Sequence, residues 1–304
     1  MADRAEDKPR PRSGLCIIDK PSGMTSHDVV AKLRRIVGTR KVGHAGTLDP
    51  MATGVLVVGV EKATRLLHYV SGTVKEYRAT IRLGQTTHTD DAEGELRATV
   101  DAGHLTPEQI AAAMAPFVGE IAQVPSSVSA IKQDGKRAYE RVRAGESVTL
   151  PPRHVTITRF EAMELRREGQ LFDVDVAVEC SSGTYVRALA RDVGAALGVG
   201  GHLTALRRTR VGGFDINDAL TLEQLAQAPE PVTLGLSDAV SAQFPRRELN
   251  SEQTAKLRHG VAVEPAGITG TYGAFDSSGH VIALLDELRP GESEARPVVV
   301  FSAA

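Results

Sequence analysis

The chain has no tryptophan, only two cysteines and no long apolar run, and each shortage excludes a class of protein. Seven Phe and five Tyr among 304 residues are too few for a binding surface built from rows of stacking rings. Cys16 and Cys180 lie far apart, so the chain is not a disulfide scaffold, and no Cys/His spacing resembles a zinc site. The longest apolar stretch, Val55–Val60, is far shorter than the ~20 residues of a membrane-spanning helix. We therefore expect a reduced, cytoplasmic protein that folds without metal.

The length and the changes in composition predict two domains of unequal size. At roughly 150 residues per domain, 304 residues exceed one compact core. Residues 1–13 are polar and charged, without the apolar core of a secretory signal, and we interpret them as a disordered tail. The composition becomes acidic and Pro-containing over 214–245, which we interpret as a connector. We therefore predict a larger domain at 14–245 and a small module at 246–304.

The charge is distributed unevenly although the net charge is only −2. Residues 1–80 carry 14 Lys/Arg against 8 Asp/Glu, and residues 121–213 carry 14 against 10. Residues 81–120 carry 2 against 7, and residues 214–304 carry 6 against 13. Two basic segments could form a cationic face for a polyanion, because Lys/Arg contacts to phosphate dominate non-specific affinity for nucleic acids. A solvated helix surface explains a single basic cluster equally well.

Hydrophobic periodicity predicts an α+β fold with a mixed β-sheet, because strands and helices interleave irregularly. Thr25 or Ser26 caps the first helix, and Gly38 ends it. The elements that we expect in the larger domain are strands at Leu15–Asp19, Val55–Val60, Tyr77–Leu83 and Phe172–Val178, helices at 26–37, Glu61–Val70, Pro107–Phe117 and Tyr185–Leu197, and a loop at Gln85–Glu95. In the small module we expect a helix at Ser251–His259 and strands at Thr271–Phe275, His280–Leu285 and Pro297–Phe301.

The segment Lys41–Gly54 is the densest unusual stretch of the sequence. It contains three glycines, the last of which is Gly54, together with His44, Asp49 and Pro50. We expect it to be a loop before the Val55–Val60 strand. A carboxylate held on such a loop could act as a nucleophile or a base. Taken alone, Asp49 is better explained as the cap of a turn, and His44 as the partner of a backbone carbonyl. The Gly43–Gly46 stretch is no phosphate-binding loop, because the Lys-Ser/Thr pair is missing.

Three other segments are open to two interpretations each. Asp90 and Asp91 could form an acid/base pair, but adjacent carboxylates on a loop usually repel each other and stay solvated. Tyr185 and Arg187 follow a strand and could reach a site at the sheet edge, although simple helix initiation explains them too. The basic stretch 202–210 is explained by a solvated strand face. The sequence contains no nucleophile elbow, which serine-based catalysis would need.

Taken together, six segments resemble the bacterial tRNA pseudouridine synthase B family, in that family's order, from about Gly14 to Phe214. The match is most specific in the string Gly-His-Ala-Gly-Thr-Leu-Asp-Pro at 43–50. The six segments are LCIIDKPSGM (15–24), RKVGHAGTLDPMATG (40–54), KEYRATIRLG (75–84), VPSSVSAIKQDGKRAY (124–139), CSSGTYVR (180–187) and GHLTALRR (201–208).

The resemblance implies conversion of uridine to pseudouridine at position 55 in the T-loop of tRNA, without a cofactor. It implies a pseudouridine-synthase-type sheet with flanking helices, and Asp49 as the catalytic residue. Arg187 would pair with Asp49, and Tyr77 would stack on the flipped uracil and is a candidate base for the C5 proton. The other implied substrate-binding residues are Tyr185, Leu206, His44 and Lys20; His44 would contact the displaced RNA, and Lys20 would lie near the pocket or contact phosphate.

The resemblance also implies a mobile insertion at 125–148 that closes over the tRNA T-arm. Residues 246–304 match the size of a small β-rich RNA-binding module of the PUA kind, although we identify no motif in them, and their acidity argues against strong tRNA contact. We expect a monomer without an obligate protein partner. Two other functions stay open: an RNA chaperone that uses the same surface without chemistry, and a carboxylate-nucleophile hydrolase acting on a nucleoside or sugar.

Overall fold

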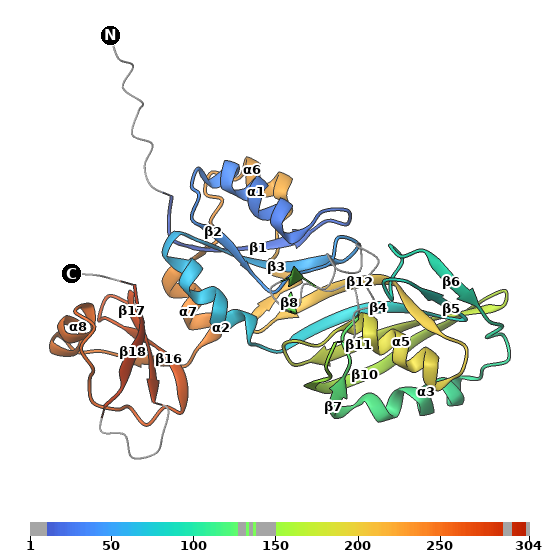
Figure 1. Cartoon of the computed structure of the whole chain (residues 1–304). Helices are drawn as coiled ribbons and strands as arrows, with labels where there is room; N and C mark the ends of the chain where they lie inside the picture. Colours follow the sequence, from blue (N-terminus) through green and yellow to red (C-terminus); the bar gives the residue numbers. More distant parts are fainter. Residues whose placement is uncertain (1–10, 127–131, 134–135, 138–149, 288–293, 302–304) are drawn as a thin grey trace, which may run out of the picture.

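The fold is built on one large β-sheet and one small β-sheet (Figure 1). The computed structural model describes residues 11–126, 132–133, 136–137, 150–287 and 294–301. The larger sheet has ten strands in the order β14-β1-β3-β12-β4-β11-β10-β7, with β2 paired to β3 and β13 paired to β12. The mixed sheet with helices confirms the predicted fold class. The strands of the larger sheet are β1 (Gly14–Lys20), β2 (Val42–Ala45), β3 (Thr53–Val60), β4 (Lys75–Leu83), β7 (Gly119–Gln123), β10 (Arg153–Glu168), β11 (Leu171–Cys180), β12 (Gly201–Val211), β13 (Phe214–Asp215) and β14 (Leu234–Gly235).

The contact between β3 and β12 joins the two halves of the large sheet and is parallel, whereas the other pairs along this order are antiparallel. Gly54 makes this contact possible. Its φ is +96°, and a Cβ at this position would lie 2.2 Å from the carbonyl oxygen of Arg208. A side chain at residue 54 would therefore force β3 and β12 apart.

Two helices of the larger unit begin at the capping residues that the sequence predicts. Thr25 forms a capping box with Asp28 at the start of the first helix, and Gly38 ends that helix with φ 71°. Thr106 caps α3 in the same manner, with Pro107 at the first position. The helices are α1 (Ser26–Val37), α2 (Leu67–Ser71), α3 (Pro107–Met114), α5 (Val186–Ala196), α6 (Leu222–Gln227), α7 (Leu236–Gln243) and α8 (Ser251–Arg258), with 3₁₀ turns η1 (Glu61–Leu66), η2 (Ala115–Phe117) and η3 (Ile216–Asp218).

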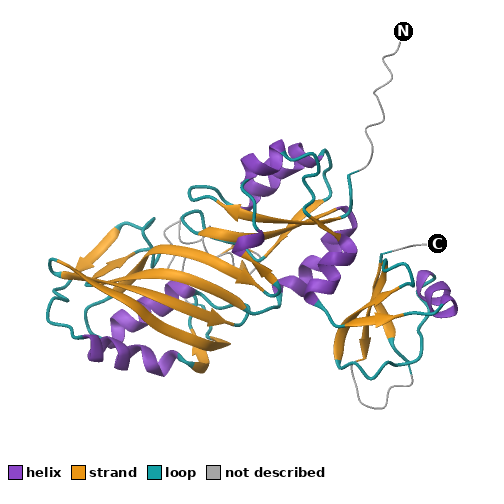
Figure 2. Cartoon of the chain, turned by 180° about the vertical axis from the view of Figure 1, so that it is seen from behind, coloured by secondary structure: helices purple, strands orange, loops and turns teal. Residues whose placement is uncertain are grey.

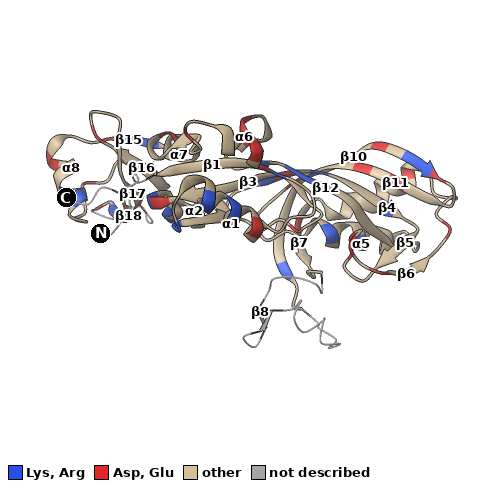
Figure 3. Cartoon of the chain, turned by 90° about the horizontal axis from the view of Figure 1, so that it is seen from above, with Lys and Arg blue, Asp and Glu red and all other residues tan. Residues whose placement is uncertain are grey.

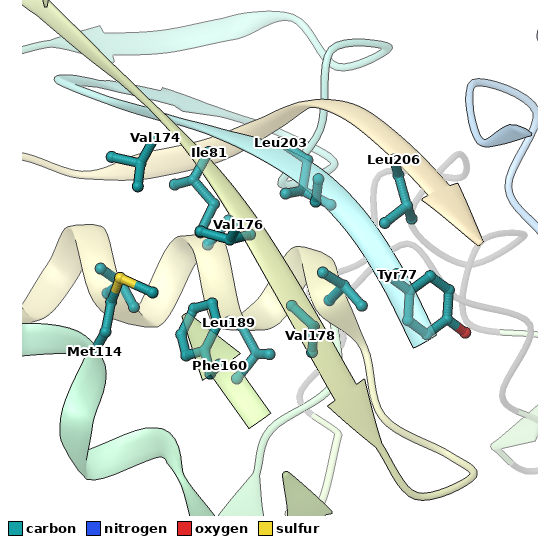
Figure 4. Packing of buried hydrophobic residues seen from close by; sticks show 14 of the residues in the cluster. Tyr77, Ile81, Met114, Phe160, Val174, Val176, Val178, Leu189, Leu203 and Leu206 are labelled. Carbon is teal, nitrogen blue, oxygen red and sulfur yellow. The ribbon is translucent and has the colours of Figure 1, made fainter. Parts of the chain in front are cut away.

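Helices cover the two halves of the large sheet separately. Helices α3 and α5 pack on β4, β10, β11 and β12 (Figure 2), where the apolar cluster runs from Met114 to Leu206 (Figure 4). Helices α1 and α6 pack on β1 and β3 through a second cluster that includes Leu33 and Leu225. The cavity described below lies where these two halves meet.

The small sheet forms a C-terminal module that shares apolar core with the large one. Its strands follow the order β15-β16-β17-β18, and it has a core of its own around Tyr272 and Ile282. Phe275, Leu284 and Phe301 belong instead to a cluster that also contains Leu15 and Val240 of the larger unit. The module therefore packs on α7 through its own hydrophobic side chains. Its strands are β15 (Arg246–Glu248), β16 (Gly270–Phe275), β17 (Val281–Glu287) and β18 (Arg296–Val300).

Three sequence-based predictions of local structure were wrong in part. Glu61–Val70 begins as a 3₁₀ turn and becomes α-helical only at Leu67. The polar run after Gly84 contains β5 (Gln85–Thr87), which pairs with β6 (Leu96–Thr99). The four residues of β6, Leu-Arg-Ala-Thr, are all exposed, and an alternation this short did not predict a strand. Part of the expected loop before β3 is strand β2, which places His44 opposite Val58.

Strand β12 is not the solvated strand that its basic composition suggested. Arg207 and Arg210 are half-buried and form ion pairs with Asp19 and Glu76, both at or below 2.7 Å. Similar pairs lie on the neighbouring strands, where Arg82 meets Asp173 at 2.7 Å, and acidic and basic side chains alternate along this side of the sheet (Figure 3). Arg208, between them, is fully buried.

Candidate active site

A cavity of about 270 Å³ lies where the turn after β2, the beginning of β4, β12 and the beginning of α5 converge. Five of the seven site residues proposed from the sequence are brought together here: Asp49, Tyr77, Tyr185, Arg187 and Leu206 all line the cavity. Lys20 and His44 lie outside its lining. These five residues come from four separate segments, so tertiary structure alone assembles the site.

The turn that carries Asp49 is fixed on both sides. The Asp49 carbonyl accepts a hydrogen bond from the Ala52 amide at 3.1 Å, which closes the turn. Next to it, the buried Ser26 hydroxyl accepts from the Leu48 amide at 2.9 Å and donates to the Leu48 carbonyl at 3.1 Å. Since Ser26 begins α1, the turn is attached to that helix. The carboxylate is thus presented by a rigid backbone.

Lys20 supports the Asp49 turn from the interior, so of its two expected roles a place near the pocket fits its contacts and contact with phosphate does not. Its side chain is 0% exposed, and its amine donates to the carbonyls of Pro21, Pro50 and Ala52 at 2.6–3.1 Å. Burial lowers the pKa of Lys20 to about 8. A side chain with no access to solvent cannot reach an RNA phosphate, whereas it can hold the two carbonyls that follow Asp49.

Arg187 joins Asp49 to a second carboxylate. Its Nε lies 3.0 Å from Asp49 Oδ2, and its Nη2 lies 3.3 Å from Asp49 Oδ1, which confirms the proximity of the two side chains. Its Nη1 donates to Asp91 Oδ2 at 3.1 Å and to the Thr89 carbonyl at 2.9 Å. The guanidinium is 6% exposed and is therefore held by fixed partners on two sides.

Asp91 is the residue that the sequence interpretation missed. Instead of a solvated neighbour of Asp90, it is 2% exposed and bonded to Arg187, whereas Asp90 pairs with Arg191 at 3.4 Å. Asp90 has φ +60°, and this left-handed conformation allows the two adjacent carboxylates to take different partners. The Asp-Asp pair within the polar run Gln85–Glu95 was the available signal, but it carried no information about Arg187.

The Asp49 carboxylate is accessible but partly desolvated. Its side chain is 36% exposed, so it is not sealed in the interior. Burial raises the pKa of Asp49, the charge of Arg187 opposes this rise, and the charge of Asp91 adds to it. A carboxylate that is poorly solvated yet ion-paired is more reactive toward carbon or a proton than one in free solution.

Tyr77 and Leu206 form the apolar part of the cavity. They lie on the adjacent strands β4 and β12, at the end of the apolar cluster, with the Tyr77 hydroxyl pointing away from the cluster (Figure 4). Burial raises the pKa of Tyr77, and Arg208 acts in the opposite direction. The ring is therefore a neutral phenol in the resting site.

Tyr185 is held through its backbone by a buried glutamine. The Gln123 side chain accepts from the Tyr185 amide at 2.8 Å and donates to the Tyr185 carbonyl at 3.1 Å. Gln123 ends β7 and is 3% exposed, and Tyr185 is the N-cap of α5. This double contact fixes the start of the helix that carries Arg187.

His44 lies on β2 beside the exposed His27 of α1, with ring centroids 5.4 Å apart in an edge-to-face arrangement. Its Nδ1 is buried without a hydrogen-bond partner in the described part of the chain. Burial lowers the pKa of His44 to about 4. The ring is neutral near pH 7 and does not line the cavity, so it is not placed for proton transfer at Asp49.

The described residues contain no group of three or more His, Cys, Asp or Glu arranged to hold a metal ion. Over the same residues, no helix is long and apolar enough to cross a membrane. The chemistry that the site itself offers is a carboxylate with a fixed guanidinium, beside a tyrosine ring and a leucine that suit a flat, partly apolar group.

Comparison with known proteins identifies the family. The model of the TruB family pseudouridylate synthase N-terminal domain matches residues 34–186. Two further models, a tRNA pseudouridylate synthase B C-terminal domain and a tRNA pseudouridine synthase II C-terminal region, match residues 187–234 and 244–302. The three matches follow one another along the chain and together include the whole cavity.

Curated relatives and solved structures agree with these matches. The chain is 60% identical over 276 residues to tRNA pseudouridine synthase B of Rhodococcus jostii, covering 90% of each protein, and 58% identical over 281 residues to that of Mycobacterium ulcerans, covering 92% of this chain and 93% of the relative. A chain of the crystal structure of a Cbf5-Nop10-Gar1 complex superposes with a TM-score of 0.73 at 29% identity, over 95% of this chain and 85% of that one. The protein therefore belongs to the TruB family of pseudouridine synthases.

Proposed function

We propose that this protein isomerises uridine to pseudouridine at position 55, in the T-loop of tRNA. The observation that carries the proposal is the Asp49 carboxylate, 36% exposed in a cavity and 3.0 Å from the buried Arg187. The curated relatives are named tRNA pseudouridine synthase B, which supports tRNA as the substrate. The net reaction moves one bond within a nucleotide, so it needs no oxidant, reductant or energy source.

Asp49 performs the first step on a nucleotide that has left its stack. It either attacks the ribose C1′ or uracil C6, or it removes the C2′ proton; each route uses an ionised carboxylate. Arg187 favours that ionised form and fixes the orientation of the two oxygens. Asp91 and Thr89 hold Arg187 in turn, so the carboxylate keeps its geometry when substrate enters.

The other site residues bind and orient the uracil. Extruding a base costs a few kcal/mol, which contacts with the flipped nucleotide must offset. Tyr77 offers a ring for stacking, and Leu206 and Tyr185 complete the walls of the cavity. We assign His44 to the RNA surface outside the cavity, since its neutral ring lies beside exposed His27.

Several predictions remain proposals. We propose the domain limits 14–245 and 246–304, an RNA-binding role of the PUA kind for the C-terminal module, a monomeric state and a cytoplasmic location. The proposed RNA-clamping insertion at 125–148, including Lys132, Lys136, Arg137, Arg141 and Arg143, lies almost entirely outside the residues whose side chains the structure describes.

The decisive experiment compares wild-type protein with Asp49→Asn on an unmodified tRNA transcript. Pseudouridine is mapped by carbodiimide-dependent stops of reverse transcription, and tRNA binding is measured in parallel. Since asparagine has the same shape without the charge, we expect a stop at position 55 with wild type, a loss of activity on the order of 10⁴-fold or more in the variant, and retained binding.

The same assay separates the alternatives. Equal stops with both proteins would remove Asp49 from the mechanism. Binding and refolding of tRNA without any stop would favour the RNA chaperone, and release of free uracil would favour the nucleoside hydrolase.

A further inference from the structure

Two buried cations line the cavity, and neither has a carboxylate partner among the residues that the structure describes. Lys75 is 6% exposed, and its amine donates to the carbonyls of Ser71 and Thr73, both at 2.9 Å. Arg208 is 1% exposed and donates to the carbonyls of Val55 at 2.7 Å and Gly46 at 3.0 Å. Within the described part of the chain, no acidic oxygen lies within 4.0 Å of either group, unlike the arrangement around Arg187.

Nearby titratable groups do not supply the missing negative charge. Burial raises the pKa of the Cys180 thiol to about 11 and also raises that of Tyr77, so both are neutral near pH 7. Each cation therefore loses hydration on folding and recovers only hydrogen bonds to neutral groups, which is unfavourable for stability. Charges retained at such a cost beside a cavity are typical of a functional site.

We propose that Lys75 and Arg208 form a cationic wall that stabilises negative charge on the uracil ring after the glycosidic bond breaks. This inference rests on the proposed uridine isomerisation. Both side chains line the cavity together with Tyr77, on which we expect the ring to stack. Their positions are fixed before the reaction by backbone carbonyls, so no reorganisation is needed when the charge appears.

The charge follows from the bonds that change. The C1′–N1 bond breaks, and its electron pair stays on the uracil, which becomes an anion delocalised over N1, O2 and O4. C1′ is left as an oxocarbenium ion, as an ester of Asp49 or, where Asp49 has taken the C2′ proton, as a glycal. The ring then turns, and C5 forms a bond to C1′ as Asp49 leaves C1′ or returns the C2′ proton. C5 loses its proton and N1 gains one, so atoms and charge balance between uridine and pseudouridine. The cationic wall stabilises the uracil anion from the time the C1′–N1 bond breaks until C5 bonds to C1′.

The test compares two substrates with different leaving groups. Single-turnover rates are measured with tRNA containing uridine or 5-fluorouridine at position 55, by nuclease digestion and chromatography of the remaining starting nucleoside. Loss of the starting nucleoside is followed because C5 of 5-fluorouridine carries fluorine in place of the proton and cannot complete the last step. Fluorine makes the departing ring a weaker base, which reduces its need for external stabilisation. The variants are Lys75→Met, which removes the charge but keeps the length, and Lys75→Arg, which keeps the charge. Lys256→Met, on the exposed face of α8, is the matched control.

We expect Lys75→Met to slow the uridine substrate on the order of 100-fold, but the 5-fluorouridine substrate only about tenfold. Lys75→Arg should recover most of the difference, and Lys256→Met should change neither rate. Equal losses on both substrates, or a Lys75→Arg protein as slow as Lys75→Met, would overturn the proposal. The ratio of the two rates does not depend on the folded fraction, because partial unfolding lowers both equally. Failure of wild type to convert uridine would instead overturn the proposed function.

Discussion

The larger unit and the C-terminal module bury different kinds of side chain. The larger unit encloses Lys20, Lys75, Asp91, Arg187 and Arg208, all in or next to the cavity. Among the described residues of 246–301, none of the charged side chains is buried, and the interior is formed by groups such as Tyr272, Phe275 and Ile282. Burying charge opposes folding, whereas burying apolar surface favours it. The larger unit therefore gives up stability for chemistry at its cavity, whereas the described part of the module buries apolar groups without burying charge.

We expect the largest effect on stability from a substitution in the C-terminal module. Phe275 is fully buried in the cluster shared by both units, so we expect Phe275→Ala to lower the free energy of unfolding by about 4 kcal/mol. Single-turnover activity of the folded protein should stay near wild type. Denaturant unfolding and rate measurements on the same preparation check this, with Phe275→Leu as the milder control. A large loss of rate in fully folded Phe275→Ala protein would mean that the module takes part in the chemistry.

Asp91→Asn tests the buried charges of the larger unit and should act mainly on the single-turnover rate. Loss of one anchor of Arg187 allows the guanidinium to shift, so we expect a decrease in single-turnover rate on the order of 100-fold. Because the charge of Asp91 raises the pKa of Asp49, the acid limb of the pH–rate profile should move to lower pH. Asp90→Asn, which affects an acid paired with Arg191, should show a smaller loss. An acid limb that does not move would contradict the link between Asp91 and Asp49.

The smallest effect should come from His44, at the edge of the site. Its pKa is lowered from 6.5 to about 4, so between these pH values the unfolded chain binds a proton that the folded chain does not. Unfolding free energy should therefore fall as the pH is lowered through this window. His44→Gln should remove on the order of 2 kcal/mol of this acid sensitivity, measured by denaturant unfolding at pH 7 and pH 4.5. His259→Gln, outside the large sheet, is a control; equal pH dependence in both proteins would show that His44 is not the responsible group.

Local elements and several residues of the cavity could be predicted from the sequence. Thr25 and Gly38 fix the ends of α1 through capping that depends on near neighbours, and alternation over Tyr77–Leu83 identifies β4. The family resemblance identifies Asp49, Arg187 and Tyr77, which the structure places in one cavity. Periodicity did not detect β6, because it has only four residues and none of them is buried.

The environment of each charge depended on contacts between distant segments. Asp91 meets Arg187 from 96 positions away, and Arg208 reaches the Val55 carbonyl across 153 positions. Neither Asp90-Asp91 nor the basic stretch 202–210 differs in composition from a solvated surface, so the sequence did not show which acid or which arginine is buried. The sequence by itself thus determined which residues can react and which segments become helix or strand, because these depend on side-chain chemistry and local hydrogen bonds. Only the tertiary structure decided which charges lose water and which partners they then meet, because desolvation depends on what the rest of the chain packs against them.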